Sequence, residues 1–249
     1  LPSQDYTGVG SDKISLGDWV ASKFIGLIFD PKLRYIFGQK RSTIDLYRVM
    51  NEGKILLVNL SKGLLGIPNS RFFGMVLLTK LYATALERAK VPASQRNDFS
   101  IYVDEFHSIA TQAFINLLSE GRKFGVNLTL ANQFVTQIRD ARIAESILGN
   151  VGTLICFRLG ISDAERLEQE FSPVFSRFDL MNLPNWVACV RTLKRGQKVL
   201  SFTLETELDL TPYDNQIAKE VRKISQKRYG RAREEVEEEI KESLKRKRD

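Results

Sequence analysis

The chain has 249 residues, of which 43% are hydrophobic and 27% are charged, so it can bury one large core and is too short to require two domains. Its formal net charge of +7 is compatible with a polyanionic partner but does not demand one. No apolar stretch approaches the ~18–20 residues of a bilayer-spanning helix, and no signal peptide is present. Because the chain starts at Leu1 without a methionine, we expect a fragment, with any membrane anchor outside it.

The first part of the chain predicts an arm, two short helices and an extended segment between them. Residues 1–16 are polar and contain glycine, which indicates an N-terminal arm or loop. Residues 17–30 and 42–53 are typical of short helices, and an extended segment is expected between them at 34–38.

A regular alternation follows. "KILLVNL" at 54–60 is a continuous apolar run of strand length. Residues 69–90 have helical spacing, with Pro68 before them and Asn69 or Ser70 as the expected N-cap.

The same alternation continues along the chain. "FSIYVDEF" at 99–106 predicts a second strand, and a helix over 111–123 should stop at Gly125. Strands are also expected within 126–133 and 152–160. Continuous apolar strands that alternate with helices predict an α/β fold with a mainly parallel sheet, covered on both faces.

The last part of this region predicts one more helix and a hairpin. The helix over 162–171 should open with a capping box between Ser162 and Glu165. Strands at 186–193 and 198–206 are separated by a turn sequence, which indicates a closing β-hairpin. Two cysteines, Cys156 and Cys189, lie in apolar runs without metal-site spacing, so we expect reduced core residues of a cytosolic protein.

From Tyr213 the composition changes to a charged tail with 12 Lys/Arg and 9 Asp/Glu in blocks. Such a tail is either a solvated helical appendage or a contact for nucleic acid or a partner. The expected organisation is an arm at 1–16, one α/β domain at 17–210 and a helical tail at 211–249.

Polar side chains end two neighbouring predicted strands. Asp104 and Glu105 close one strand and Gln133 closes the next, so all three should meet at the carboxyl edge of the sheet. An Asp there can hold Mg²⁺ against nucleotide phosphates through water, the next carboxylate can polarise an attacking water, and a Gln can orient that water or sense the γ-phosphate. The alternatives are a strand that leaves into a polar turn and an ordinary strand-end Gln.

Two arginines are candidates for stabilising a phosphate. Arg122 ends a helix that runs away from Asp104 and Glu105, so it can serve a neighbouring subunit's site in trans or can simply complement the helix dipole. Arg158, near the end of a strand, is a candidate in cis. His107, the only histidine, is expected to be a hydrogen-bonded turn residue rather than a metal ligand.

Three stretches, "EGKILLVNLSKGLLGIPNSRFFGMVLLTKL", "IYVDEFHSIATQAFINLLSEGRKFGVNLTLANQ" and "ILGNVGTLICFRLG", resemble the HerA/FtsK branch of RecA-like P-loop ATPases, and above all the conjugative coupling proteins of type IV secretion. The resemblance covers about residues 17–210. It implies part of a RecA-like three-layer sandwich in a ring-forming, usually hexameric motor that hydrolyses ATP with Mg²⁺ to move DNA. By this resemblance Asp104 is the Walker B aspartate, Glu105 the catalytic glutamate, Gln133 the sensor and Arg122 the arginine finger in trans.

The chain departs from this family in one respect, because it contains no G-x-x-x-x-G-K-[ST] phosphate loop. In the family that loop lies upstream of the segment seen here. We therefore expect the C-terminal part of a motor domain, inactive in isolation, with the phosphate loop cut away or on another polypeptide. The alternatives are a HerA-type motor of DNA-end processing and a non-catalytic assembly or DNA-binding module.

The resemblance also implies partners and a location. DNA should bind without sequence preference, and a relaxase and secretion-channel proteins are possible partners. The full-length protein should be cytoplasmic, at the cytoplasmic face of the inner membrane, and should reach the membrane only through segments outside this chain.

Overall fold

The computed structural model of the chain describes residues 30–138 and 140–245. The arm expected at 1–16 and nearly all of the helix expected at 17–30 lie outside this part of the chain. The structure divides into two compact units, one formed by Asp45–Asp214 and the other by Leu1–Ile44 together with Asn215–Asp249.

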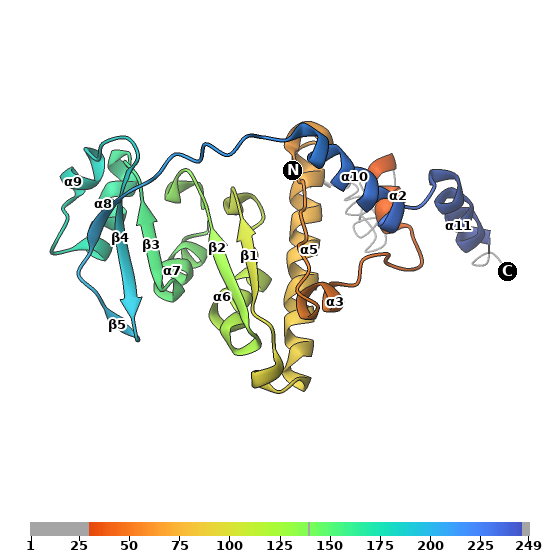
Figure 1. Cartoon of the computed structure of the whole chain (residues 1–249), viewed down its shortest axis with the longest axis horizontal. Helices are drawn as coiled ribbons and strands as arrows, with labels where there is room; N and C mark the ends of the chain where they lie inside the picture. Colours follow the sequence, from red (N-terminus) through yellow and green to blue (C-terminus); the bar gives the residue numbers. More distant parts are fainter. Residues whose placement is uncertain (1–29, 139, 246–249) are drawn as a thin grey trace, which may run out of the picture. The chain divides into compact units, whose positions relative to one another are not determined.

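The larger unit contains one parallel strand pair. Strands β1 (Phe99–Val103) and β2 (Val126–Leu130) lie side by side in the register Phe99↔Val126 to Val103↔Leu130 (Figure 1). Side chains alternate across the pair, so Ile101 is buried while Tyr102 is 75% exposed. The sheet was expected to be covered on both faces. Within the described residues, however, the face that carries Ser100, Tyr102 and Thr129 is exposed.

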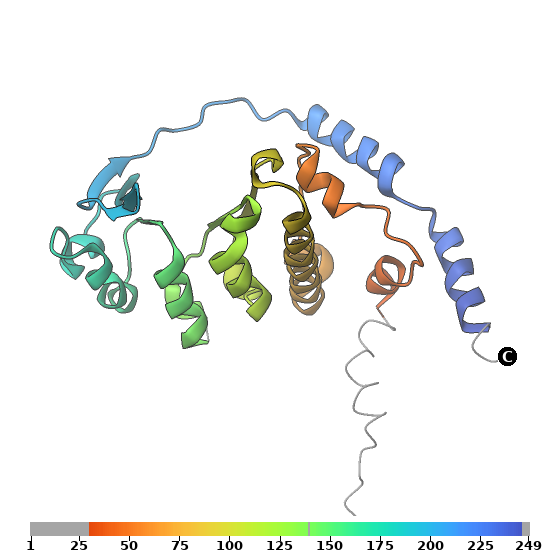
Figure 2. The same ribbon diagram turned by 90° about the horizontal axis from the view of Figure 1, so that it is seen from below.

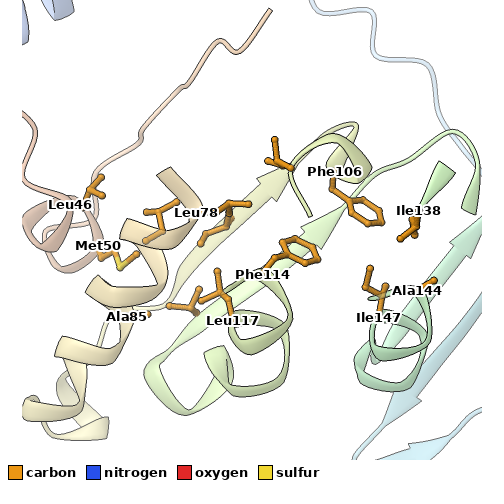
Figure 3. Packing of buried hydrophobic residues seen from close by; sticks show 14 residues of the cluster. Leu46, Met50, Leu78, Ala85, Phe106, Phe114, Leu117, Ile138, Ala144 and Ile147 are labelled. Atoms are coloured by element: carbon orange, nitrogen blue, oxygen red, sulfur yellow. The ribbon is translucent and has the colours of Figure 1, made fainter. Parts of the chain in front are cut away.

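Four helices contribute to the core on the other side of the pair. They are α3 (Leu46–Asn51), α5 (Ile67–Glu87), α6 (Gln112–Glu120) and α7 (Ala141–Asn150), and the last three lie next to one another (Figure 2). Helix α6 packs against β2, α5 and α7 flank α6, and α3 packs against α5. Their apolar side chains form one core with the inner face of the strands (Figure 3). Phe106 and Phe114 stack in this core with ring centroids 5.7 Å apart, which fixes the chain directly after β1 against α6.

A separate antiparallel sheet follows. Strand β3 (Thr153–Cys156) pairs with β4 (Val187–Lys194), and β4 pairs with β5 (Gln197–Lys198) and β6 (Phe202–Glu205). Helices α8 (Ile161–Phe171) and α9 (Arg177–Met181) pack on it around a second core.

The α/β class and the closing hairpin are thus confirmed. The mainly parallel sheet, however, is restricted to β1 and β2 among the described strands. Residues 153–156 were expected to extend the parallel sheet, but β4 returns alongside them and supplies their backbone partners in the antiparallel direction.

Three local expectations are wrong. Residues 54–60 form no strand in the structure: Ile55 is 88% and Leu57 81% exposed, and no strand of the described residues pairs with them. Helix α5 begins earlier than expected, after Gly66, so that Ser70 lies inside it and donates to the Leu60 carbonyl at 2.5 Å. Helix α8 begins after Gly160 without a side-chain cap, so the expected capping box does not form.

The smaller unit contains α2 (Pro31–Phe37), α10 (Asn215–Tyr229) and α11 (Arg233–Lys245). The extended segment expected at 34–38 is therefore wrong, because Asp30 caps a helix there by accepting from the N–H groups of Lys32 and Leu33. Acidic residues of α11 face α2, and Glu237 accepts from Tyr35.

The helices of the tail confirm its expected helical character. Among the described residues, no helix combines the length and the apolar character that crossing a membrane requires.

Candidate active site

The turn after β1 places two carboxylates at the carboxyl end of the strand. Asp104 is exposed, and one of its oxygens accepts from the Glu105 N–H at 2.9 Å. Glu105 itself adopts the left-handed conformation, with φ 50° and ψ 41°. For a residue with a Cβ this conformation costs about 1–2 kcal/mol. Such strain persists where the surroundings enforce it, and it is typical of functional sites.

Neighbouring contacts hold this turn. The Glu105 carbonyl accepts from both the N–H and the hydroxyl of Ser108, at 3.1 and 2.9 Å. Phe106 is only 5% exposed and inserts into the core between the two strands and α6. A buried aromatic residue thus anchors the turn from below while Asp104 and Glu105 remain at the surface.

The ends of β1 and β2 are joined through His107. Its Nδ1 lies 2.5 Å from Oδ1 of Asn132, and because an amide oxygen only accepts, Nδ1 carries the hydrogen. The same nitrogen lies 3.6 Å from Oε2 of Glu105. His107 is therefore the hydrogen-bonded turn residue expected from the sequence, and its bond to Asn132 ties the turn after β1 to the residue immediately before Gln133.

Gln133 is exposed at the same edge of the strand pair. The backbone ladder continues past the strands, since Ala131 N–H donates to Val103 O at 2.9 Å and Phe106 N–H to Ala131 O at 3.4 Å. The structure thus brings together the chain segments that carry Asp104, Glu105 and Gln133.

The loop that follows Gln133 is fixed by a buried carboxylate. Asp163 on α8 is 3% exposed and accepts from the N–H groups of Val135 and Thr136 at 3.0 and 3.1 Å. Asp163, which lies on α8, therefore stabilises the short 3₁₀ helix (Val135–Gln137) that follows Gln133.

Arg122 lies at the opposite end of the strand pair. It belongs to a 3₁₀ turn (Gly121–Phe124) that leads through Gly125 into the first residue of β2, which pairs with the first residue of β1. Asp104 follows the last residue of β1, and five residues of strand separate the two ends by about 13 Å. The structure thus does not bring Arg122 to the carboxylates of its own chain.

Arg158 follows β3 in the antiparallel sheet. It is exposed and donates from Nη2 to Oδ1 of Asn185 at 3.0 Å. No contact that the structure shows for the described residues joins it to Asp104, Glu105 or Gln133.

The donor set fits Mg²⁺ bound together with a nucleotide. Residues 30–138 and 140–245 contain no group of three or more His, Cys, Asp or Glu side chains placed to hold a metal ion by themselves. Mg²⁺ usually keeps several waters and needs only one or two carboxylates besides the substrate phosphates. Asp104, an exposed carboxylate at a strand end, meets that requirement, and the bound ion would neutralise phosphate charge.

Sequence reasoning missed two residues of this site. Asn132 and Asp163 were not singled out, although both contact the candidate residues or their loop. Asn132 adjoins Gln133 and could have been noticed as a second polar residue at the strand end. Asp163 gave no signal, because its partners lie 27 and 28 residues away in sequence.

Comparison with known proteins bears on these residues. Residues 98–182 match the family model described as the TraM recognition site of TraD and TraG. Over these residues the chain is TraD/TraG-like. The matched stretch runs from β1 to the end of α9, so it contains Asp104, Glu105, Arg122, Gln133 and Arg158. The resemblance expected from the sequence is confirmed for this segment.

Solved structures provide more distant likenesses. The unbound bacterial conjugative coupling protein TrwBdeltaN70 is 16% identical with a TM-score of 0.47, over 57% of this chain and 38% of that chain. TrwB with a non-hydrolysable ATP analogue is 15% identical with a TM-score of 0.49, over 60% and 39%. The genome packaging NTPase B204 of Sulfolobus turreted icosahedral virus 2, in complex with AMPPCP, is 12% identical with a TM-score of 0.46, over 68% and 74%.

The chain thus spans less than two fifths of the TrwB chains that it matches. Among curated proteins it has no match.

Proposed function

We propose that this chain is part of an ATP-driven DNA translocase, of the kind that delivers DNA to a type IV secretion channel. The observation that carries the proposal is the gathering of Asp104, Glu105 and the Asn132–Gln133 pair at one strand edge, where His107 bonds to Asn132 and lies beside Glu105. This edge lies within the TraD/TraG-like segment. A folding requirement alone does not explain a strained Glu beside an exposed Asp.

The residues take complementary roles in ATP hydrolysis. Asp104 would hold Mg²⁺, which would supply positive charge against the nucleotide phosphates, Glu105 would polarise the attacking water, and Gln133 would orient that water or sense the γ-phosphate. The phosphate loop of a RecA-like domain must come from outside residues 1–249, because the sequence contains none. Residues 1–249 alone are then expected to show no ATP turnover.

Arg122 acts across a subunit boundary in this proposal. Its place at the far end of the strand pair supports this role, because it is removed from its own chain's Asp104 and Glu105. A ring, with a hexamer as the expected size, would set Arg122 of one subunit against the γ-phosphate of the next. Arg158 is the candidate for the same task in cis.

The partners follow from the proposed activity. DNA binds without sequence preference, and relaxase, TraM-like and secretion-channel proteins are the expected protein partners. The full-length protein would work in the cytoplasm, at the inner face of the inner membrane, and would reach the membrane through segments outside this chain.

The test is turnover by the intact motor. Glu105→Gln should bind ATP normally and lose hydrolysis, and Asp104→Ala should also weaken Mg²⁺-dependent binding. Glu145→Gln on α7 is the matched control, because Glu145 is exposed on a helix and outside the site. Near-normal hydrolysis by Glu105→Gln would refute the assignment of water activation to Glu105.

A second candidate function rests on the description of the matching family model, which names recognition of TraM. In that case residues 98–182 bind a partner protein without any catalytic part. Glu105→Gln would then leave both partner binding and DNA transfer unchanged, whereas a motor would keep the binding and lose the transfer.

A further inference from the structure

Two arginines bind the main chain that directly follows Arg122. Arg96 donates from Nη1 to the Lys123 carbonyl and from Nε to the Val91 carbonyl, the latter at 2.8 Å. Arg88 donates from Nη1 to the Gly125 carbonyl at 3.3 Å and from Nη2 to the Asn97 carbonyl. The carbonyls one and three residues after Arg122 are thus both held by a guanidinium.

Burying the guanidinium of Arg88 is energetically unfavourable. Its exposed fraction is 0%, and its burial lowers the pKa of its guanidinium. Among the described residues it forms no ion pair within 4.0 Å, so backbone carbonyls are its main partners. A buried cation held by carbonyls fixes their position strongly, because moving any of them leaves charge unsatisfied.

Backbone hydrogen bonds to the β1–β2 pair also hold the turn that carries Arg122. Gly125 has φ 67°, its N–H donates to the Arg122 carbonyl at 3.2 Å, and its carbonyl accepts from Phe99 N–H at 2.9 Å as well as from Arg88. The backbone of Arg122 is therefore tied through Gly125 to the first residue of β1.

The side chain of Arg122 has no comparable support. It is exposed, and the structure shows no hydrogen bond or ion pair from it to the described part of the chain. Only its backbone can set where the guanidinium lies. A group that must meet a phosphate on another subunit needs such fixed placement, since a misplacement of about 1 Å can cost about 10²-fold in rate.

We propose that Arg88 and Arg96 are positioning residues that hold the turn carrying Arg122 in place for the neighbouring subunit. This inference rests on the proposed function, in which Arg122 acts in trans. The two arginines touch neither nucleotide nor Mg²⁺ and act only through the turn.

The first measurement is steady-state ATP hydrolysis by the intact ring. Arg96→Ala should lower kcat by about 10²-fold and leave the KM for ATP within threefold, because the nucleotide site of the same subunit is untouched. The kcat of Arg96→Lys should lie between those of the wild type and Arg96→Ala, since one ammonium cannot bind several carbonyls as a guanidinium fork does. Arg142→Ala is the matched control, because the side chain of that exposed arginine bonds to Asp140 and to no other residue that the structure describes.

The deciding measurement uses mixed rings. Arg96→Ala subunits contain a sound Glu105, so mixing them with Glu105→Gln subunits, whose Arg122 turn is sound, should restore partial activity. Mixing them with Arg122→Ala subunits should restore none. A merely structural defect would damage the variant's own site and would prevent recovery with either partner.

The outcomes separate this inference from the proposed function. If Arg122→Ala and Glu105→Gln complement each other but Arg96→Ala and Glu105→Gln do not, the positioning role is wrong and the trans role stands. An Arg96→Ala ring with the wild-type kcat would also show that the positioning role is wrong while the trans role stands. If Arg122→Ala and Glu105→Gln fail to complement in rings shown to be mixed, the trans role itself is refuted.

Discussion

Replacing Asp163 by Asn should destabilise the larger unit far more than an isosteric change usually does. Asp163 is 3% exposed, and each of its two oxygens accepts one backbone N–H from the loop after Gln133. In Asn one oxygen becomes an NH₂ group, which can only donate. One loop N–H then faces another donor, and the other loses a charged acceptor.

The magnitude follows from these two contacts. An N–H left without a partner costs about 1–3 kcal/mol, and exchanging a charged for a neutral acceptor costs about 1 kcal/mol more. Because both hydrogen bonds to Asp163 are only partly buried, the lower part of this range applies. We expect the free energy of unfolding to fall by about 2–3 kcal/mol.

The assay is urea unfolding of the chain followed by far-UV circular dichroism. With a slope of about 2–3 kcal/mol/M, the midpoint should fall by about 1 M. Asp140→Asn is the control, because Asp140 caps α7 at the surface and Asn caps a helix as well as Asp does. Equal midpoints for the two variants would refute the argument that buried acceptors fix this loop.

Three further predictions concern other parts of the chain. Burial raises the pKa of Cys156 to about 12 and also raises the pKa of Cys189, so alkylation of the folded chain should stay slow at pH 9 while the unfolded chain reacts. Because burial raises the pKa of Cys156 in the folded chain, the stability that comes from this buried neutral thiol is complete below the unfolded pKa of about 8.5 and is lost as pH rises toward 12. Rapid alkylation of the folded chain at pH 9 would contradict the raised pKa. His107→Phe removes the bond to Asn132 and should lower kcat of the intact motor about tenfold with ATP affinity unchanged, as measured by turnover and nucleotide titration; an unchanged kcat would show that the link is dispensable. Replacing the basic residues of α10 by Gln should weaken DNA binding and reduce its salt slope by about 0.9 for each phosphate that α10 no longer neutralises, and an identical slope would remove α10 from DNA binding.

Several features could be predicted from neighbouring residues alone. The strand at 99–103 and its exit into Asp104 follow from an apolar run and the polar pair after it. Gly125 ends the helical segment with φ 67°, a conformation that glycine adopts without strain. Arg195 and Gly196 both have positive φ in the turn that joins β4 to β5, as tight hairpins require. Helix α2 also carried a local signal that was overlooked, namely Asp30 followed by Pro31.

Other features depended on partners distant in sequence. Residues 54–60 have the composition of a strand, but no described strand pairs with them. Strand β3 took its direction from β4, which begins 31 residues after β3 ends. Asp163 gave no signal in the sequence, and it holds the loop beyond Gln133. Periodicity reports which side chains prefer burial. It does not report which distant donor or acceptor will satisfy a given backbone group, and that pairing is determined only when the chain has folded.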